Sequence, residues 1–106
     1  MGISDLLMEI SGFLNISATG RKVLEVLARN RGGLLVSEIV ARTKRSERAV
    51  RAHIKHLFEL HLIRRESVVT RKGKLAYLYL VPRADELVES IRAEVLRQLH
   101  RLESYL

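Results

Sequence analysis

The sequence predicts a mostly helical fold with one small β-hairpin and a long helix at its C-terminal end. Three observations support this prediction. Two short segments with helical spacing are separated by a tight turn at Thr43-Lys44-Arg45. The spacing then changes to the composition and alternation typical of strands, interrupted by a turn that contains Gly73. Finally, apolar residues recur every three or four positions from Leu87 to Leu106.

Two amphipathic helices are predicted before the turn, over residues 3–14 and 18–30. In both segments apolar residues recur at helical spacing with charged or polar residues between them. Ser17 or Thr19 is the expected N-cap of the second helix, because a hydroxyl oxygen accepts a hydrogen bond from a free backbone amide there. The glycine-containing stretch 30–33 then breaks the helix.

Two shorter helices follow, at about 38–43 and 47–60. Ser37 and Ser46 are their expected N-caps. Glu47 lies in the first turn of the second one, where the helix dipole favours an anion. Two short helices joined by a turn of three to four residues form a helix-turn-helix pattern.

A basic hairpin is predicted directly after this pattern. Leu62–Val68 and Leu75–Val81 are rich in β-branched and aromatic residues and are expected to be its strands. Gly73, in the turn between them, can adopt the positive φ that a tight hairpin requires. Pro82 is expected to end the second strand. Such a hairpin is a wing, so the predicted fold is a winged helix-turn-helix, with residues 69–75 at the tip of the wing.

The last helix is predicted over residues 83–105, which corresponds to roughly 35 Å at 1.5 Å per residue. Its apolar stripe, widened by Val88 and Leu96, consists of Leu87, Ile91, Val95, Leu99, Leu102 and Leu106. A stripe this long exceeds what one small domain needs, so a second copy of the chain is expected to cover it. The predicted organisation is an N-terminal amphipathic helix (1–15), a winged helix-turn-helix (16–81) and a C-terminal dimerisation helix (82–106), with the N-terminal helix contributing to the homodimer.

Composition narrows the function classes. The chain has 106 residues and no cysteine, which excludes disulfides and thiolate metal sites. No stretch approaches the roughly 18–20 consecutive apolar residues that span a bilayer, and the N-terminal segment lacks the pattern of a signal peptide. We therefore expect a cytoplasmic protein without a membrane partner.

The net charge of +7 is concentrated in one third of the chain. Residues 42–74 carry eleven basic side chains against three acidic ones, a balance of +8. Residues 1–41 are neutral overall, and residues 75–106 have a balance of −1. A confined basic block indicates a surface that faces a polyanion.

The helix at 46–60 has two different faces on a helical wheel. Val50, Ile54 and Leu57 cluster on the side expected to face the core. Because an α-helix fits the major groove of B-DNA, the opposite side is predicted to enter that groove. Arg48 and Arg51 are the candidate base readers there. The remaining candidates are Ala52 for close approach, Lys55, Lys44, Arg45 and Ser46 for phosphates, and Arg71, Lys72 and Lys74 of the wing for phosphates or the minor groove.

These features predict a homodimeric, sequence-specific regulator of transcription that binds double-stranded DNA. Two alternatives remain open. The same fold serves architectural, chromatin-like proteins that bind DNA without sequence preference, and a basic block can also meet an acidic protein partner. A basic helix face taken alone is often merely solvated. Arg64 and Arg65 are further candidates for the same surface, and Tyr77 and Tyr79 are expected to pack rather than stack on bases.

Residues 16–81 resemble archaeal winged-helix regulators of the TrmB-like group, within the wider MarR/ArsR class. The stretches that carry the resemblance are ISATGRKVLEVLARNRGGLLVSEIVARTKRSERAVRAHIKHLFELHLIRRE and, after the wing, AYLYLV. The resemblance implies the winged-helix fold and no particular target or effector. His61 departs from the pattern, which has glycine at this position. The position needs a left-handed backbone, which His tolerates better than most residues.

Metal and catalytic chemistry find little support. His53 and His56 are three apart and can meet on one helix edge, yet no cysteine or close carboxylate pair accompanies them. His53 is expected at the rim of the core and His56 near DNA or solvent. No phosphate-binding glycine loop and no arrangement of nucleophile, base and acid is present. We therefore expect no enzyme activity, no cofactor and no metal site.

Overall fold

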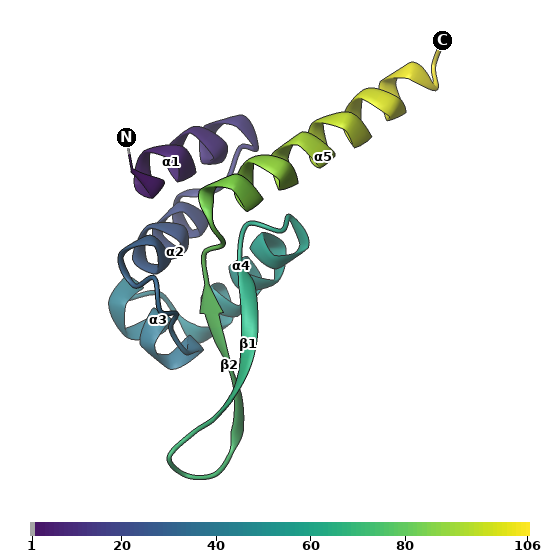
Figure 1. The fold of residues 1–106 in the computed structure, drawn as a ribbon. Coiled ribbons are helices and arrows are strands. Elements are labelled where there is room, and N and C mark those ends of the chain that lie inside the picture. The colour runs from purple at the N-terminus through teal and green to yellow at the C-terminus, as the bar shows by residue number, and fades with distance from the viewer. Residues whose placement is uncertain (1) are drawn as a thin grey trace.

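The computed structural model describes residues 2–106, which form five helices and one antiparallel hairpin. Figure 1 shows a compact helical body, a hairpin that projects from it and a last helix that leads away from it. The elements are α1 (Ile3–Phe13), α2 (Ala18–Arg29), α3 (Val36–Thr43), α4 (Glu47–Glu59), β1 (Arg64–Val69), β2 (Leu75–Leu80) and α5 (Ala84–Glu103). The predicted winged helix-turn-helix with a long C-terminal helix is confirmed.

The N-caps of α2, α3 and α4 define where these helices begin. Ser17 Oγ accepts a hydrogen bond from the Gly20 amide at 3.2 Å, and Ser46 Oγ accepts one from Ala49 at 3.1 Å, as predicted. The prediction of Ser37 as a cap is wrong, because α3 begins at Val36. There the Glu38 carboxylate accepts from the Leu35 amide at 2.8 Å, so the acidic side chain satisfies the free donor from inside the helix.

Left-handed residues terminate elements at the positions where the chain changes direction. Lys44 ends α3 with φ 57°, and His61 follows α4 with φ 60°. The prediction that His61 adopts the backbone conformation of the usual glycine is therefore confirmed. Gly73 has φ 75° in the turn of the hairpin, also as predicted.

The hairpin is regular and slightly shorter than predicted. Its register pairs Arg64 with Leu80 at the base and Val69 with Leu75 near the tip. Leu62 and Ile63 lie outside β1, because the pairing with β2 begins at Arg64, and both side chains are buried in the core. Turn hydrogen bonds close the tip, from Thr70 N to Lys74 O at 2.8 Å and from Gly73 N to Thr70 O at 2.9 Å.

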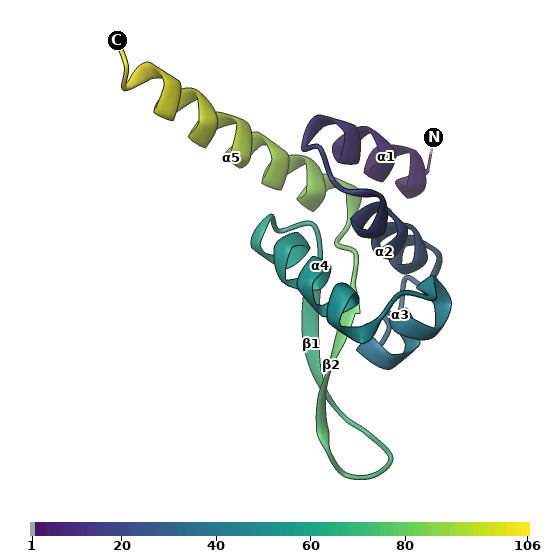
Figure 2. The same cartoon turned by 180° about the vertical axis from the view of Figure 1, so that it is seen from behind.

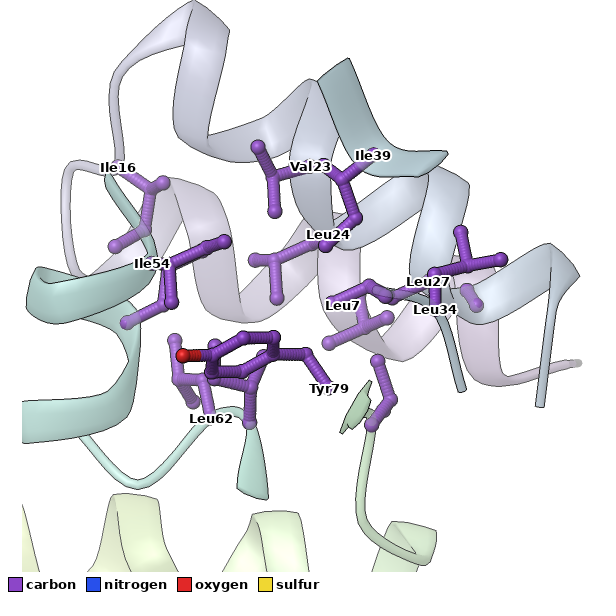
Figure 3. Packing of buried hydrophobic residues seen from close by; sticks show 14 of the residues in the cluster. Leu7, Ile16, Val23, Leu24, Leu27, Leu34, Ile39, Ile54, Leu62 and Tyr79 are labelled. Carbon is purple, nitrogen blue, oxygen red and sulfur yellow. The ribbon is translucent and has the colours of Figure 1, made fainter. Parts of the chain in front are cut away.

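The hydrophobic core is centred on α2, which is surrounded by α1, α3, α4 and β2. Figure 3 shows side chains from α1, α2, α3, α4 and β2 meeting beneath the helices. The side chains with 0% exposure are Val23, Leu27, Ile39, Val50, Leu62 and Leu87. Each such side chain contributes about 1.5–3 kcal/mol through burial, so this centre holds the body of the fold together.

Helix α5 extends well beyond the core. Its first turn is attached through Leu87, which is fully buried, and Ile91 packs against the core in part. Every residue from Val95 to Leu106 is exposed. Figures 1 and 2 show the helix leaving the body, and the molecule measures 56 × 28 × 26 Å along its principal axes. No helix within residues 2–106 is both long and apolar enough to cross a membrane.

Candidate nucleic-acid interface

Helix α4 separates its side chains as the helical wheel predicts. Val50, Ile54 and Leu57 are buried, with exposures of 0%, 5% and 1%. Arg48, Arg51, Ala52 and Lys55 are exposed. The cations therefore stand on the solvent side of a helix whose opposite side is fixed in the core. A helix anchored in this way presents its charges in a defined direction.

The turn before α4 adds charge at its N-terminus. Lys44, Arg45 and Ser46 are all exposed. Below them Thr43 is buried, and its hydroxyl donates to Ile39 O at 2.8 Å and accepts from Arg45 N at 3.4 Å. This buried hydroxyl fixes the backbone of the turn, because a buried polar group without a partner would be costly. Ser46 Oγ is occupied by the capping hydrogen bond described above.

The tip of the wing carries the third group of predicted residues. Arg71, Lys72 and Lys74 are all exposed around Gly73. Figure 1 shows the tip projecting from the body at the end opposite α5. The charges of the wing therefore stand apart from the helix charges, at the end of a narrow two-stranded arm.

A cleft of about 400 Å³ lies between the helix-turn-helix and the wing. Its lining comes from the start of α3, from α4, from β2 and from the turn of the hairpin: Leu35, Val36, Ser37, Glu47, Arg51, Thr70, Leu75, Ala76, Tyr77 and Tyr79. Arg51 thus faces the wing across this cleft. The Nη2 atom of Arg51 lies 3.7 Å from the Glu47 carboxylate, and both side chains are more than half exposed. Such a pair contributes about 0–1 kcal/mol and leaves Arg51 free to exchange partners.

The cations of residues 42–74 differ from those of α5 in their pairing. Arg51 and Arg64 each take part in one ion pair, and the other nine cations of this block have no carboxylate partner within residues 2–106. Of the four arginines at the N-cap of α5 and within the helix, by contrast, three pair with carboxylates, namely Arg83, Arg92 and Arg97. Unpaired positive charge is therefore concentrated on the helix-turn-helix and the wing.

Arg65 occupies a position that the sequence did not reveal. Its guanidinium carbon lies 4.6 Å from the centre of the Phe58 ring and 4.2 Å from the centre of the Tyr77 ring. The Tyr77 side chain is 44% exposed, whereas that of Tyr79 is buried, with an exposure of 7%. The sequence signal was the alternation of Tyr77 and Tyr79, which places both rings on one face of the hairpin. Only the register, which pairs Arg65 with Tyr79, brings the arginine to that face.

Arg64 lies on the opposite face of β1. Its Nη1 atom lies 3.6 Å from the Glu86 carboxylate of α5. The two neighbouring arginines therefore do not share one surface: Arg64 faces the last helix, and Arg65 faces α4.

The histidines do not gather. His53 is half-buried, and its Nδ1 lies 2.8 Å from Ala49 O in the preceding turn, whereas His56 is exposed. Within residues 2–106, no group of three or more His, Asp or Glu side chains stands close enough together to hold a metal ion.

No protein-family model matches the sequence, and no curated protein is significantly similar to it. Solved structures do share its architecture. A possible transcriptional regulator from Methanosarcina mazei superposes with a TM-score of 0.70 over 91% of this chain and 81% of its own, at 18% identity. A MarR family transcription regulator superposes with a TM-score of 0.59 over 98% of this chain and 68% of its own, at 16% identity. The fold is that of the MarR-like winged-helix regulators.

Two other solved structures have a similar fold. A protein from the thermoacidophilic archaeon Sulfolobus tokodaii is 25% identical, with a TM-score of 0.63, and the match covers 92% of this chain and 90% of that protein. A mutant of MepR from Staphylococcus aureus, bound to an oligodeoxyribonucleotide, is 20% identical, with a TM-score of 0.59, and the match covers 98% of this chain and 78% of that protein. Winged helices of archaeal and bacterial origin thus superpose on nearly the whole of this chain.

Proposed function

We propose that this protein is a homodimeric transcription regulator that binds double-stranded DNA sequence-specifically. The observation that carries the proposal is the unpaired positive charge on the exposed face of α4 and on the wing. Charges without carboxylate partners are available to neutralise phosphates and release counterions, which is the main source of affinity for DNA. The oligodeoxyribonucleotide bound to the structurally similar MepR supports the proposal of DNA binding.

Helix α4 is proposed to enter the major groove. Arg48 and Arg51 would read base edges, because a planar guanidinium makes two parallel hydrogen bonds to guanine. Ala52 lies among the exposed cations, and its small side chain permits close approach to the groove floor. Lys55, a point charge one turn further on, is better suited to a phosphate.

Phosphate contacts are proposed at two places, the N-terminus of α4 and the tip of the wing. Lys44, Arg45 and Ser46 flank the N-terminus of α4, where free backbone amides favour an anion. Arg71, Lys72 and Lys74 at the wing tip would contact flanking phosphates or the adjacent minor groove. Because the wing stands apart from α4, the two elements reach separate segments of one duplex.

The homodimer is proposed to form through α5, with a contribution from α1. Val95, Leu99, Leu102 and Leu106 form the exposed part of its stripe, and a contiguous apolar surface of this kind marks an interface. Ile91 is half-buried and lies beside α1, in an apolar groove formed with Leu6, Ile10, Val88 and Arg92. Leu87 is a correction to the predicted interface: its side chain is fully buried in its own protomer and is not available to a second copy.

The deciding experiment is selection of bound sites from a random duplex pool, followed by salt titration of the selected duplex. A dimer should select a pseudo-palindrome with half-sites roughly 34 Å apart. If four or five phosphates per subunit are neutralised, log affinity should fall with log salt at a slope of about −7 to −9. Equal affinity for selected and random duplexes would instead establish an architectural protein. Absence of duplex binding at physiological salt would overturn the proposal in favour of an acidic protein partner.

Membership of the TrmB-like group is part of the same proposal and rests on the resemblance of residues 16–81, which names no target or effector.

A further inference from the structure

The guanidinium of Arg65 is held between two aromatic rings from different elements. Phe58 lies in the last turn of α4, Arg65 near the start of β1, and Tyr77 in the middle of β2. The guanidinium carbon stands 4.6 Å from one ring centre and 4.2 Å from the other. Both distances are within the roughly 6 Å over which a cation is attracted to a ring face. One side chain thus connects α4 with both strands of the wing.

The cation–π contacts with the two rings are the main interactions of the Arg65 side chain. Its side chain makes no hydrogen bond or ion pair with any residue in the range 2–106. Arg51 and Lys55 line the same small pocket of about 150 Å³, whose other walls are Val36, Ile54, Phe58 and Tyr79. No carboxylate from the described part of the chain lines this pocket. Two like charges therefore oppose the position of Arg65, and the attraction of the rings must offset that repulsion.

Arginine suits this position better than lysine. Its flat, weakly hydrated guanidinium has two equivalent faces and can stack on a ring with each, whereas an ammonium is a compact, strongly hydrated charge. The contact also lies at the base of the wing, only a few residues from the His61 turn that connects α4 to β1. A small change of angle at this base would displace the tip by a larger distance, because the tip lies at the far end of the arm.

We propose that Arg65 is a positioning residue that fixes the wing relative to helix α4, through Phe58 and Tyr77, and does not itself contact DNA. The proposal rests on the proposed function, since it explains how α4 and the wing tip are held at the separation at which both reach one duplex. Ordering the wing before binding reduces the conformational entropy that binding would otherwise lose.

The test compares three substitutions and one matched control. Tyr77→Leu removes one ring and leaves every charge in place. Arg65→Met removes the cation, and Arg65→Lys keeps the charge without the two flat faces. The control is Arg64→Met, which removes the neighbouring cation from the opposite face of β1, where it pairs with Glu86. Phe58 is left intact because it packs partly into the core.

Two measurements are made on each variant. The first is affinity for the selected duplex, with its salt slope. The second uses amide relaxation and residual dipolar couplings without DNA, which report the order and orientation of the wing relative to α4. Tyr77→Leu and Arg65→Met are expected to lower affinity by about 5- to 30-fold and to loosen the wing in the free protein. Arg65→Lys should show most of the same loss, and Arg64→Met should remain within about twofold of wild type.

Every result decides for or against the positioning role. If Arg65→Met weakens binding and lowers the salt slope by about one per subunit while Tyr77→Leu behaves as wild type, Arg65 contacts a phosphate and the proposal is overturned. Normal wing order in both variants also overturns it. If the wild-type protein binds no duplex, the proposed function fails, whereas the wing order of the free variants still decides whether Arg65 fixes the wing.

Discussion

Leu34 and Tyr79 exchange two backbone hydrogen bonds, each 2.8 Å long. The pair forms an isolated antiparallel bridge between the segment before α3 and the end of β2. The base of the wing is therefore attached to the helix-turn-helix by its backbone, as well as by side chains such as Arg65. This bridge satisfies the amide and carbonyl groups of Leu34, whose side chain is buried.

The bridge depends on Gly33, which directly precedes Leu34. Gly33 has φ +99°, and a Cβ atom there would lie 2.7 Å from Leu78 Cγ and 3.1 Å from Tyr79 O. Gly33→Ala should therefore destabilise the fold by about 1–3 kcal/mol, measured by urea denaturation. Gly32→Ala is the matched control, because a Cβ atom at that position would have open space within 4 Å around it. Equal stability of the two variants would show that the tight turn is not required.

His61 carries a backbone strain that can be measured. Its φ of 60° is left-handed, which costs an ordinary L residue about 1–2 kcal/mol. His61→Val should be less stable than His61→Gly by at least that amount, because a β-branched side chain tolerates this conformation poorly. His61→Gly should be at least as stable as wild type, since the side chain of His61 is exposed. A valine variant as stable as the glycine variant would contradict the assigned conformation.

The proposed base reading by α4 and the proposed phosphate contact by the wing predict different effects of substitution. Arg51→Ala should relax the preference at one base pair by about 1–3 kcal/mol, because a base-edge contact discriminates between sequences. Arg71→Ala combined with Lys72→Ala should weaken binding to all sequences alike and make the salt slope shallower. Site selection and salt titration measure both effects. If the two sets of variants act identically on every sequence, Arg51 is not a base reader.

The proposed dimer interface predicts a difference between two faces of α5. Leu99 is 48% exposed on the apolar stripe, whereas Ala93 is exposed on the opposite side of the helix. Leu99→Glu should shift the protein from dimer to monomer in analytical ultracentrifugation, because a charge is costly in an apolar interface. Ala93→Glu, which adds the same charge, should remain dimeric. Monomeric behaviour of the wild type, or of both variants, would place the interface elsewhere.

The start of α5 should be sensitive to acid. Hydrogen bonding to Arg83 lowers the pKa of Asp85 below its ordinary value of 3.8. The stability from this pair is present above the unfolded-state pKa and is lost as pH falls through the lower folded-state pKa. Asp85→Asn should therefore unfold more easily than wild type at neutral pH, and the difference should disappear at strongly acidic pH. A difference that persists in acid would attribute the effect to something other than the carboxylate charge.

Local rules account for much of the fold. Ser17 and Ser46 cap helices because a short hydroxyl side chain satisfies free amides wherever it precedes an apolar helical pattern. The exposed cations of α4 follow from its helical period. The exception is the start of α3, where Glu38 satisfies the backbone donor and Ser37 does not cap the helix. Two competing local caps differ by too little free energy for the sequence pattern to choose between them.

The sequence alone determined the order and approximate bounds of the helices and strands, because periodicity, capping and turn chemistry act between residues close together in the chain. It also concentrated the positive charge in residues 42–74. The tertiary structure alone decided how distant segments meet. It joined Leu34 to Tyr79, placed Arg65 between Phe58 and Tyr77, and buried Leu87 in the core. These contacts depend on strand register and on the packing of elements far apart in sequence, which no local pattern specifies.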